Sequence, residues 1–293
     1  MSRPLSYASW EAILPHFEFN KRLRIVLHCP ELQTLDRQLG AKASNVDVVG
    51  TTLEIDKVKY SISTVYKNVP EKRHKEMRPK MVQVFQVKFC RERYQHGELH
   101  TGSLGFAEVS KRSLSFAQNY LMRKLLSRIR CIGTATVHPV RRIPVQTDID
   151  LSLLASAKLL RLTHFIDNEI MVALRNCNVF CEYVSEKHLA KILITDWQQK
   201  NYSVGRKYKL FFIFKSEVAE RYEYITSIPG GTKGRIPGIR TADSFPHCIT
   251  FALSPDSELN VYCVEGEGDL LRMFDSVFYL TFEINPKGHA QCL

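Results

Sequence analysis

A cluster of short helices is predicted by residues 4–40, PLSYASWEAILPHFEFNKRLRIVLHCPELQTLDRQLG, near the start of the chain. Ser6 is of a type that caps helix N-termini, and Leu5 and Trp10 occupy the two positions of a hydrophobic staple around it. Pro15 disfavours helical structure at the preceding residue, because its ring clashes with the previous turn. One helix face, with apolar residues at i, i+3, i+4 and i+7, is formed by Trp10, Ile13, Leu14 and Phe17.

Two further short helices complete the predicted cluster. Asn20 is expected to cap the second helix, and Pro30 to end it. Gly40 supplies a C-terminal stop for the third helix, since glycine readily adopts the left-handed conformation. The apolar residues of these two segments are Leu23, Ile25, Val26, Leu27, Leu32, Leu35 and Leu39.

The apolar side chains of this cluster either pack on the body of the same chain or bind a partner. Periodicity alone favours internal packing, because the apolar stripe of a surface helix usually faces the core. Large side chains such as Trp10 are, however, also typical anchors of protein interfaces. On the second interpretation, the partner-binding residues are Leu5, Trp10, Ile13, Leu14, Phe17, Ile25, Pro30 and Leu32.

Several motifs of this chain resemble the F-box C proteins, a large nematode family that begins with a degenerate F-box. Near the N-terminus these motifs are Pro4-Leu5-Ser6-Tyr7, Ile13-Leu14, Arg22 and the Cys29-Pro30-x-Leu32 step. Further along they are TTLEIDKVKYSIS (51–63), ILITDWQQKNYSVGRKYKLFF (192–212) and SELNVYCVEGEG (257–268). The resemblance therefore spans most of the chain, with a gap in the middle.

An F-box implies docking to a Skp-type adaptor of a cullin-based ubiquitin ligase, while the domain that follows it selects the protein target. The resemblance thus implies a substrate-recruiting subunit that has no catalytic, cofactor-binding or metal-binding residues of its own. It also places the helical cluster at the interface with the adaptor and leaves the identity of the target open.

Composition is that of a folded protein inside the cell. At 293 residues, 44% of them hydrophobic, the chain can build one large or two moderate domains. It contains no apolar run of about 18 residues, so no membrane-spanning helix is expected. The N-terminus lacks a signal-peptide pattern, so we expect a cytoplasmic or nuclear protein whose eight cysteines are reduced thiols.

The net charge of +11 is concentrated in one segment. Residues 66–130 contain 15 Lys or Arg and 5 acidic residues, while the rest of the chain is almost neutral. Within that segment, YKNVPEKRHKEMRPK (66–80) lacks periodicity and is predicted to be a basic loop or linker over 66–81. A solvated insertion is the commoner explanation of such a run. The alternative function is nucleic-acid binding through residues 66–130 by phosphate neutralisation.

The remaining sequence predicts an α/β (α+β) fold. The expected divisions are a helical module at 1–43, a β-hairpin at 44–65 that turns at Asp56-Lys57, the basic loop, and a C-terminal domain at 82–293. That domain alternates helices and strands and ends in strands, with an irregular leucine-rich-like stack as one version of it. Helices are predicted at 113–129 and 185–200, strands at 82–90, 132–140, 178–184, 207–215, 248–253, 259–264 and 277–284, and a loop at 229–238.

No complete catalytic motif is present in the sequence. HGELH at 96–100 places its glutamate in the middle rather than directly after the first histidine, as a metalloprotease helix requires. PGGTKGRIPG at 229–238 lacks the Gly-Lys-Ser/Thr ending of a phosphate-binding loop. Cys177 and Cys181 fit one strand but lie too far apart for a single tetrahedral metal. We therefore expect a protein that is not an enzyme.

Overall fold

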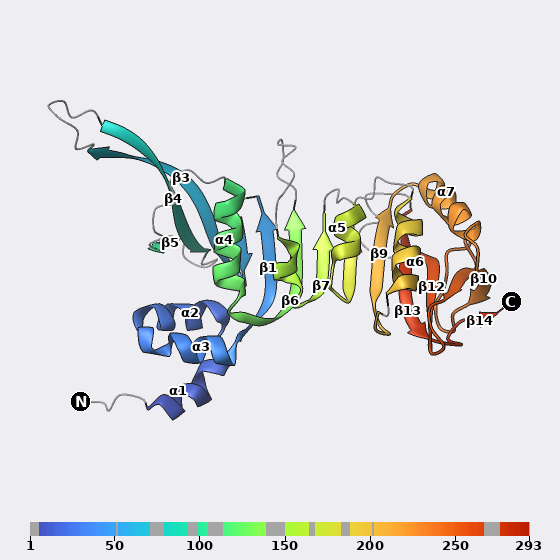
Figure 1. The fold of residues 1–293 in the computed structure, drawn as a ribbon, viewed down its shortest axis with the longest axis horizontal. Coiled ribbons are helices and arrows are strands. Elements are labelled where there is room, and N and C mark those ends of the chain that lie inside the picture. Colours follow the sequence, from blue (N-terminus) through green and yellow to red (C-terminus); the bar gives the residue numbers. More distant parts are fainter. Residues whose placement is uncertain are drawn as a thin grey trace. The chain divides into compact units, whose positions relative to one another are not determined.

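The computed structural model divides into two compact units, Met1–Ala157 and Lys158–Leu293. The boundaries expected after residues 43, 65 and 81 all fall inside the first unit. Figure 1 shows the helices and strands of each unit. The residues that the structure describes are 6–50, 52–70, 79–92, 99–104, 114–138, 150–163, 168–182, 188–200, 202–266 and 276–292.

The N-terminal module is helical, as predicted. Its elements are α1 (Tyr7–Ile13), the 3-10 turn η1 (Leu14–His16), α2 (Phe19–His28), the 3-10 turn η2 (Pro30–Leu32) and α3 (Gln33–Leu39). The Ser6 side chain accepts a hydrogen bond from the Ser9 backbone N–H at the start of α1, which confirms the predicted cap. The α-helix ends one residue before Leu14, as Pro15 requires, and Gly40 follows α3 at φ +57°.

The predicted cap at Asn20 is wrong. Glu18 holds the N-cap position of α2, and Asn20 lies inside the helix. Its side-chain amide instead donates to the carbonyl oxygen of Ile55 at 2.7 Å and accepts from the Tyr60 hydroxyl at 2.5 Å. Asparagine favours helix caps, but Asn20 instead bonds to residues 35 and 40 positions away in the sequence.

The strands of the first unit form a mixed sheet in the order β6-β1-β2-β3-β4-β5. Strand β1 pairs parallel with β6, whereas the other neighbours are antiparallel. Asp56 and Lys57 both have positive φ between β2 and β3, which confirms the predicted hairpin turn, of the type in which both central residues are left-handed. The bounds are β1 (Ala41–Val49), β2 (Thr52–Ile55), β3 (Val58–Pro70), β4 (Pro79–Glu92), β5 (Leu99–Leu104) and β6 (Ile129–His138).

The predicted loop at 66–81 is in part strand. Strand β3 continues to Pro70 and β4 begins at Pro79, and the two pair along their whole length. Cross-strand hydrogen bonding extends the alternating segments on either side into the basic stretch, which local composition does not reveal. Residues 71–78 lie outside the described part. The predicted helix at 113–129 and strand at 132–140 are confirmed as α4 (Leu114–Leu126) and β6, and η3 (Leu151–Leu154) follows.

The second unit begins with alternating parallel strands and helices. Strands β7, β8 and β9 are parallel neighbours, with α5 between the first two and α6 between the last two. They start at residues 157, 178 and 207, intervals of 21 and 29 residues. The bounds are β7 (Ala157–Leu162), α5 (Asn168–Ala173), β8 (Asn178–Cys181), α6 (Leu189–Gln199) and β9 (Lys207–Phe212).

An antiparallel meander completes this unit. The combination of helices with a mixed sheet confirms the predicted α/β (α+β) class. The sheet order is β14-β10-β11-β12-β13-β9-β8-β7. The predicted loop at 229–238 is wrong in its centre, because Gly231–Arg235 pairs with β11 and β14 as a strand. The bounds are α7 (Lys215–Thr226), β10 (Gly231–Arg235), β11 (Cys248–Ala252), β12 (Ser257–Glu265), β13 (Phe278–Pro286) and β14 (Gln291–Cys292).

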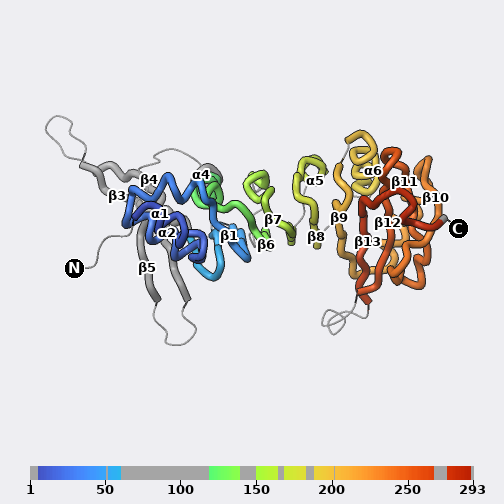
Figure 2. The backbone as a smooth tube through the Cα atoms, turned by 90° about the horizontal axis from the view of Figure 1, so that it is seen from below, coloured from blue at the N-terminus to red at the C-terminus, as the bar shows by residue number. Residues whose placement is uncertain are grey.

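One face of the second sheet is its core. A single row of side chains crosses six strands in register and is at most 2% exposed: Leu160, Val179, Tyr208, Phe282, Val261 and Ile249. Trp197 of α6 packs edge-on against Tyr208, with ring centroids 5.1 Å apart. Figure 2 shows α5 and α6 on one side of these strands. Periodicity places Leu189, Ile192, Leu193 and Trp197 on one side of α6. Leu189, Leu193 and Trp197 are buried, and Ile192 is half-buried.

A buried carboxylate fastens the end of the chain to this sheet. Glu258 accepts hydrogen bonds from the backbone N–H groups of Gly288 (2.9 Å) and Ala290 (2.7 Å) and from the Asn260 amide (3.1 Å). Burial by itself would raise the pKa of Glu258, but these hydrogen bonds outweigh it and hold the pKa below its ordinary value.

Candidate partner-binding site

The helical module has a core of its own. Leu14, Val26, Leu32 and Leu35 form one buried cluster, and Leu14 and Val26 are fully inaccessible. The prediction that Leu14 and Leu32 contact a partner is therefore corrected. Five short helical segments cannot hold their mutual arrangement without burying some apolar side chains between them, and these two fill that interior.

Five half-buried apolar residues pack against this core, and we refer to them as the apolar rim. Each member packs against the buried cluster and keeps part of its surface accessible. Predicted partner-binding residues Trp10, Phe17 and Ile25 belong to it, and the Lys21 ammonium lies 4.9 Å from the centroid of the Phe17 ring. The apolar rim consists of Trp10, Phe17, Ile25, Cys29 and Leu39.

Other apolar side chains of the module are more exposed still. Tyr7 is 57% exposed, Ile13 38% and Leu27 43%. Ile13 was predicted to bind a partner, whereas Tyr7 and Leu27 were not, although the three-residue spacing from Tyr7 to Trp10 could have indicated the former. Pro30 is also exposed, and Leu5 lies outside the described residues.

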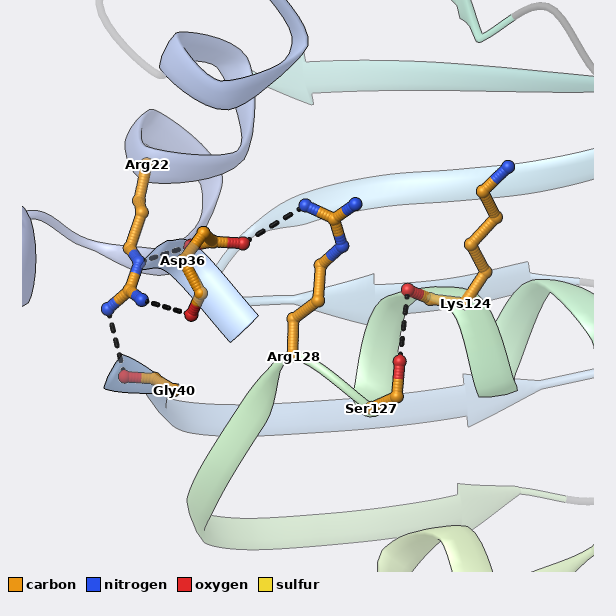
Figure 3. A network of polar contacts seen from close by, with 6 residues as sticks. All are labelled: Arg22, Asp36, Gly40, Lys124, Ser127 and Arg128. Atoms are coloured by element: carbon orange, nitrogen blue, oxygen red, sulfur yellow. Dashed lines mark hydrogen bonds and ion pairs between the residues drawn. The ribbon is translucent and has the colours of Figure 1, made fainter. Parts of the chain in front are cut away.

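A buried ionic network ties this module to the sheet of the first unit (Figure 3). The Asp36 carboxylate forms ion pairs with Arg22 and, at 3.0 Å, with Arg128. Arg22 also donates to the backbone carbonyls of Asp36 (2.6 Å) and Gly40 (2.8 Å). Arg128 precedes β6, and its carbonyl accepts from the N–H of Ala41 in β1 at 2.7 Å. Arg22, Asp36 and Arg128 are all at most 9% exposed, so water screens their charges little.

The Asn20 contacts form a second tie between the module and the sheet. Tyr60 lies on β3 and is 3% exposed. Burial, reinforced by the negative charge of Asp56, raises the pKa of its hydroxyl well above the ordinary value, so Tyr60 stays a neutral donor to Asn20. The network and this tie fix the orientation of α2 and α3, and hence of the apolar rim, on the unit.

The structure offers no metal-binding group among the residues that it describes, where no three His, Cys, Asp or Glu residues converge. Cys177 is exposed and precedes β8, whereas Cys181 is buried at the end of that strand. Asp150 caps η3 by accepting a hydrogen bond from the Ser152 N–H. In HGELH, His96 and Glu98 lie outside the described residues, and Leu99 and His100 begin β5.

The structure describes few side chains of the basic segment at residues 66–130. Where they are described, Arg123 pairs with Asp150 at 2.9 Å and Arg128 is buried against Asp36. Nucleic-acid binding through residues 66–130 thus stays a prediction. No helix in the described ranges has both the length and the apolar character needed to span a bilayer.

Comparisons with models of protein families, with curated proteins and with solved structures found no match to this chain.

Proposed function

We propose that this protein is a non-catalytic, substrate-recruiting subunit of a cullin-based ubiquitin ligase, docked to a Skp-type adaptor through its N-terminal helical module. The downstream α/β fold would hold the protein target. Recruitment of this kind raises the effective concentration of target lysines near the charged ubiquitin carrier, and it needs no reacting group on the recruiting subunit.

The observation that carries the proposal is the accessible apolar surface of the helical module. Ile13, Leu27 and Tyr7 are exposed on the same helical module as the half-buried rings of Trp10 and Phe17. Aromatic side chains such as Trp and Tyr are enriched among the few residues that supply most of the affinity of a protein interface. Together with the resemblance of residues 4–40 to an F-box, this surface favours adaptor docking over a purely internal role.

The experiment is co-purification of a Skp-type adaptor with the full chain from cells. Ile13→Asp and Leu27→Asp are the informative variants, because each places a charge on an exposed side chain and leaves the module core intact. Burying a carboxylate at the interface should reduce adaptor recovery by at least about tenfold for at least one of them. Leu14→Asp is unsuitable, since Leu14 is 0% exposed and its loss would unfold the module.

Val204→Asp is the matched control, because Val204 is 51% exposed and lies in the second unit. Wild type and Val204→Asp should recover equal amounts of adaptor. Failure of the wild type to recover any adaptor would overturn the proposal. Recovery that is unchanged in both module variants would show that a different surface is used.

A further inference from the structure

Over β7, β8 and β9 the second unit presents an accessible sheet face opposite to its buried core, whereas over β12 that face is covered, because Asn260 and Tyr262 are at most 2% exposed. On this face Arg161 of β7, Phe180 of β8 and Lys209 of β9 form one row in register, and Thr281 of β13 continues it. Arg161 and Lys209 are exposed, and Phe180 is half-buried. Parallel sheets are normally covered on both faces, and those with one open face are typical of solenoids, which use that face for binding.

Three aromatic rings gather at the centre of this face. The Phe180 and Tyr279 ring centroids are 6.1 Å apart, and those of Phe211 and Tyr279 are 5.8 Å apart. The Arg161 guanidinium lies 5.2 Å from the centroid of the Phe180 ring. All three rings are half-buried and come from three adjacent strands, so they make a continuous apolar platform.

Not every cation around this platform has an acidic partner. Arg161 pairs with Glu182 at 3.4 Å, and Lys207 pairs with Glu283 at 2.9 Å. Among the described residues Lys209 has no such acidic partner. Partial burial, reinforced by the neighbouring charge of Lys207 and opposed by that of Glu283, lowers the pKa of Lys209.

A buried polar atom beside Lys209 is also unsatisfied. The Thr281 side chain is opposite Lys209 in the register and is 1% exposed. Its hydroxyl has no hydrogen-bond partner within the part of the chain that the structure describes. At 1% exposure this hydroxyl is out of reach of a ligand, so the accessible part of the row is the part from Arg161 to Lys209.

We infer that this face, formed by Arg161, Phe180, Lys209, Phe211 and Tyr279, binds an extended acidic segment of a protein target. A carboxylate of the segment would pair with Lys209, and an adjacent apolar side chain would cover the three rings. The inference rests on the proposed function and specifies the target-binding half of it.

Charge decides between a peptide and a nucleic acid on this face. Glu182 and Glu283 both lie on it, so a regularly charged phosphate backbone would meet two carboxylates as well as the cations. A peptide can place one acidic residue at Lys209 and apolar or basic residues elsewhere.

The test is selection of peptides on the purified full chain from a random library displayed on phage. The peptides must be long enough to cross the three strands, which are about 4.8 Å apart. We expect enrichment of sequences in which Asp or Glu adjoins a large apolar residue. Synthetic copies should bind the wild type and lose at least about tenfold in affinity with Lys209→Glu, because the new carboxylate repels the acidic residue.

Two further variants separate recognition from folding. Lys209→Arg keeps the charge and should retain binding within about threefold. Lys287→Glu makes the same charge reversal just beyond the C-terminal end of β13, on the order of 20 Å along the chain from Thr281, and should leave binding unchanged. Each variant should keep the thermal midpoint of the wild type.

Enriched peptides without acidic residues, or acidic peptides that bind Lys209→Glu as tightly as the wild type, would overturn the inference. So would an absence of peptide binding combined with binding of a single-stranded RNA that Lys209→Glu abolishes. Adaptor recovery tests the helical module and not this face, so it should be unchanged in Lys209→Glu. Failure here is thus distinguishable from failure of the proposed function.

Discussion

Replacing Asp36 by asparagine tests whether the buried network holds the helical module on the sheet. The carboxylate neutralises part of the charge of two buried guanidinium groups, from Arg22 and Arg128. Asparagine keeps one oxygen but turns its NH₂ group toward guanidinium donors. Removing one partner of a buried ion pair costs about 3–5 kcal/mol, a large share of the roughly 5–15 kcal/mol that stabilises a typical domain.

Hydrogen exchange followed by mass spectrometry can measure this loss in each unit separately. In Asp36→Asn, protection of the β1 amides should fall about a hundredfold or more, since each factor of ten corresponds to about 1.4 kcal/mol. Protection of β12 in the second unit should stay as in the wild type.

Asp150→Asn is the matched control. Asp150 pairs with Arg123 at 2.9 Å, but the Arg123 side chain is 67% exposed. Asparagine caps a helix as well as aspartate, and an exposed ion pair contributes about 0–1 kcal/mol. Its effect on exchange should therefore stay within about fivefold. If Asp36→Asn were no more damaging than Asp150→Asn, the network would not be what fixes the module.

Three further predictions concern single groups. Asn20→Ala should destabilise the first unit by about 1–3 kcal/mol in urea denaturation, because the Ile55 carbonyl and the Tyr60 hydroxyl lose a buried partner; an unchanged midpoint would contradict this tie. Of the cysteine side chains that the structure describes, the exposed Cys177 should react first with a thiol reagent, while Cys263, whose pKa burial raises to about 12, should react only after unfolding. Because the pKa of Glu258 is lowered in the folded protein, its ionised form stabilises the fold above the ordinary glutamate pKa, near pH 4, and this contribution is lost as the pH falls through the lowered pKa. The urea midpoints of wild type and Glu258→Gln should therefore converge on acidification. A difference that stays constant with pH would refute the role of the hydrogen bonds to Glu258.

Local sequence signals predicted local structure well. Ser6, Pro15, Pro30 and Gly40 each act on residues within one helical turn, so their effects on helix ends can be predicted without knowing the rest of the fold. The turn at Asp56-Lys57 was predicted for the same reason. Periodicity likewise identified the buried face of α6, because that face repeats within eleven residues.

Partners far apart in the sequence were not predictable in this way. The parallel pairing of β1 with β6 joins Ala41 to Ile129, and nothing in either segment specifies the other. The strand at Gly231–Arg235 consists of glycines and polar residues that favour loops, and it is a strand because β11 supplies its hydrogen bonds. The same holds for Asn20, whose partners come from a hairpin that the helix meets only after folding.

The candidate site shows the same division. The sequence by itself determined that an apolar helical cluster opens the chain and that helices and strands alternate after it. Only the tertiary structure decided that Leu14 and Leu32 are interior while Ile13 and Leu27 remain accessible. It also decided that Arg161, Phe180 and Lys209 share one row. The physical reason is that hydrophobic periodicity specifies which side of an element is apolar, whereas burial depends on which distant segment is packed against that side.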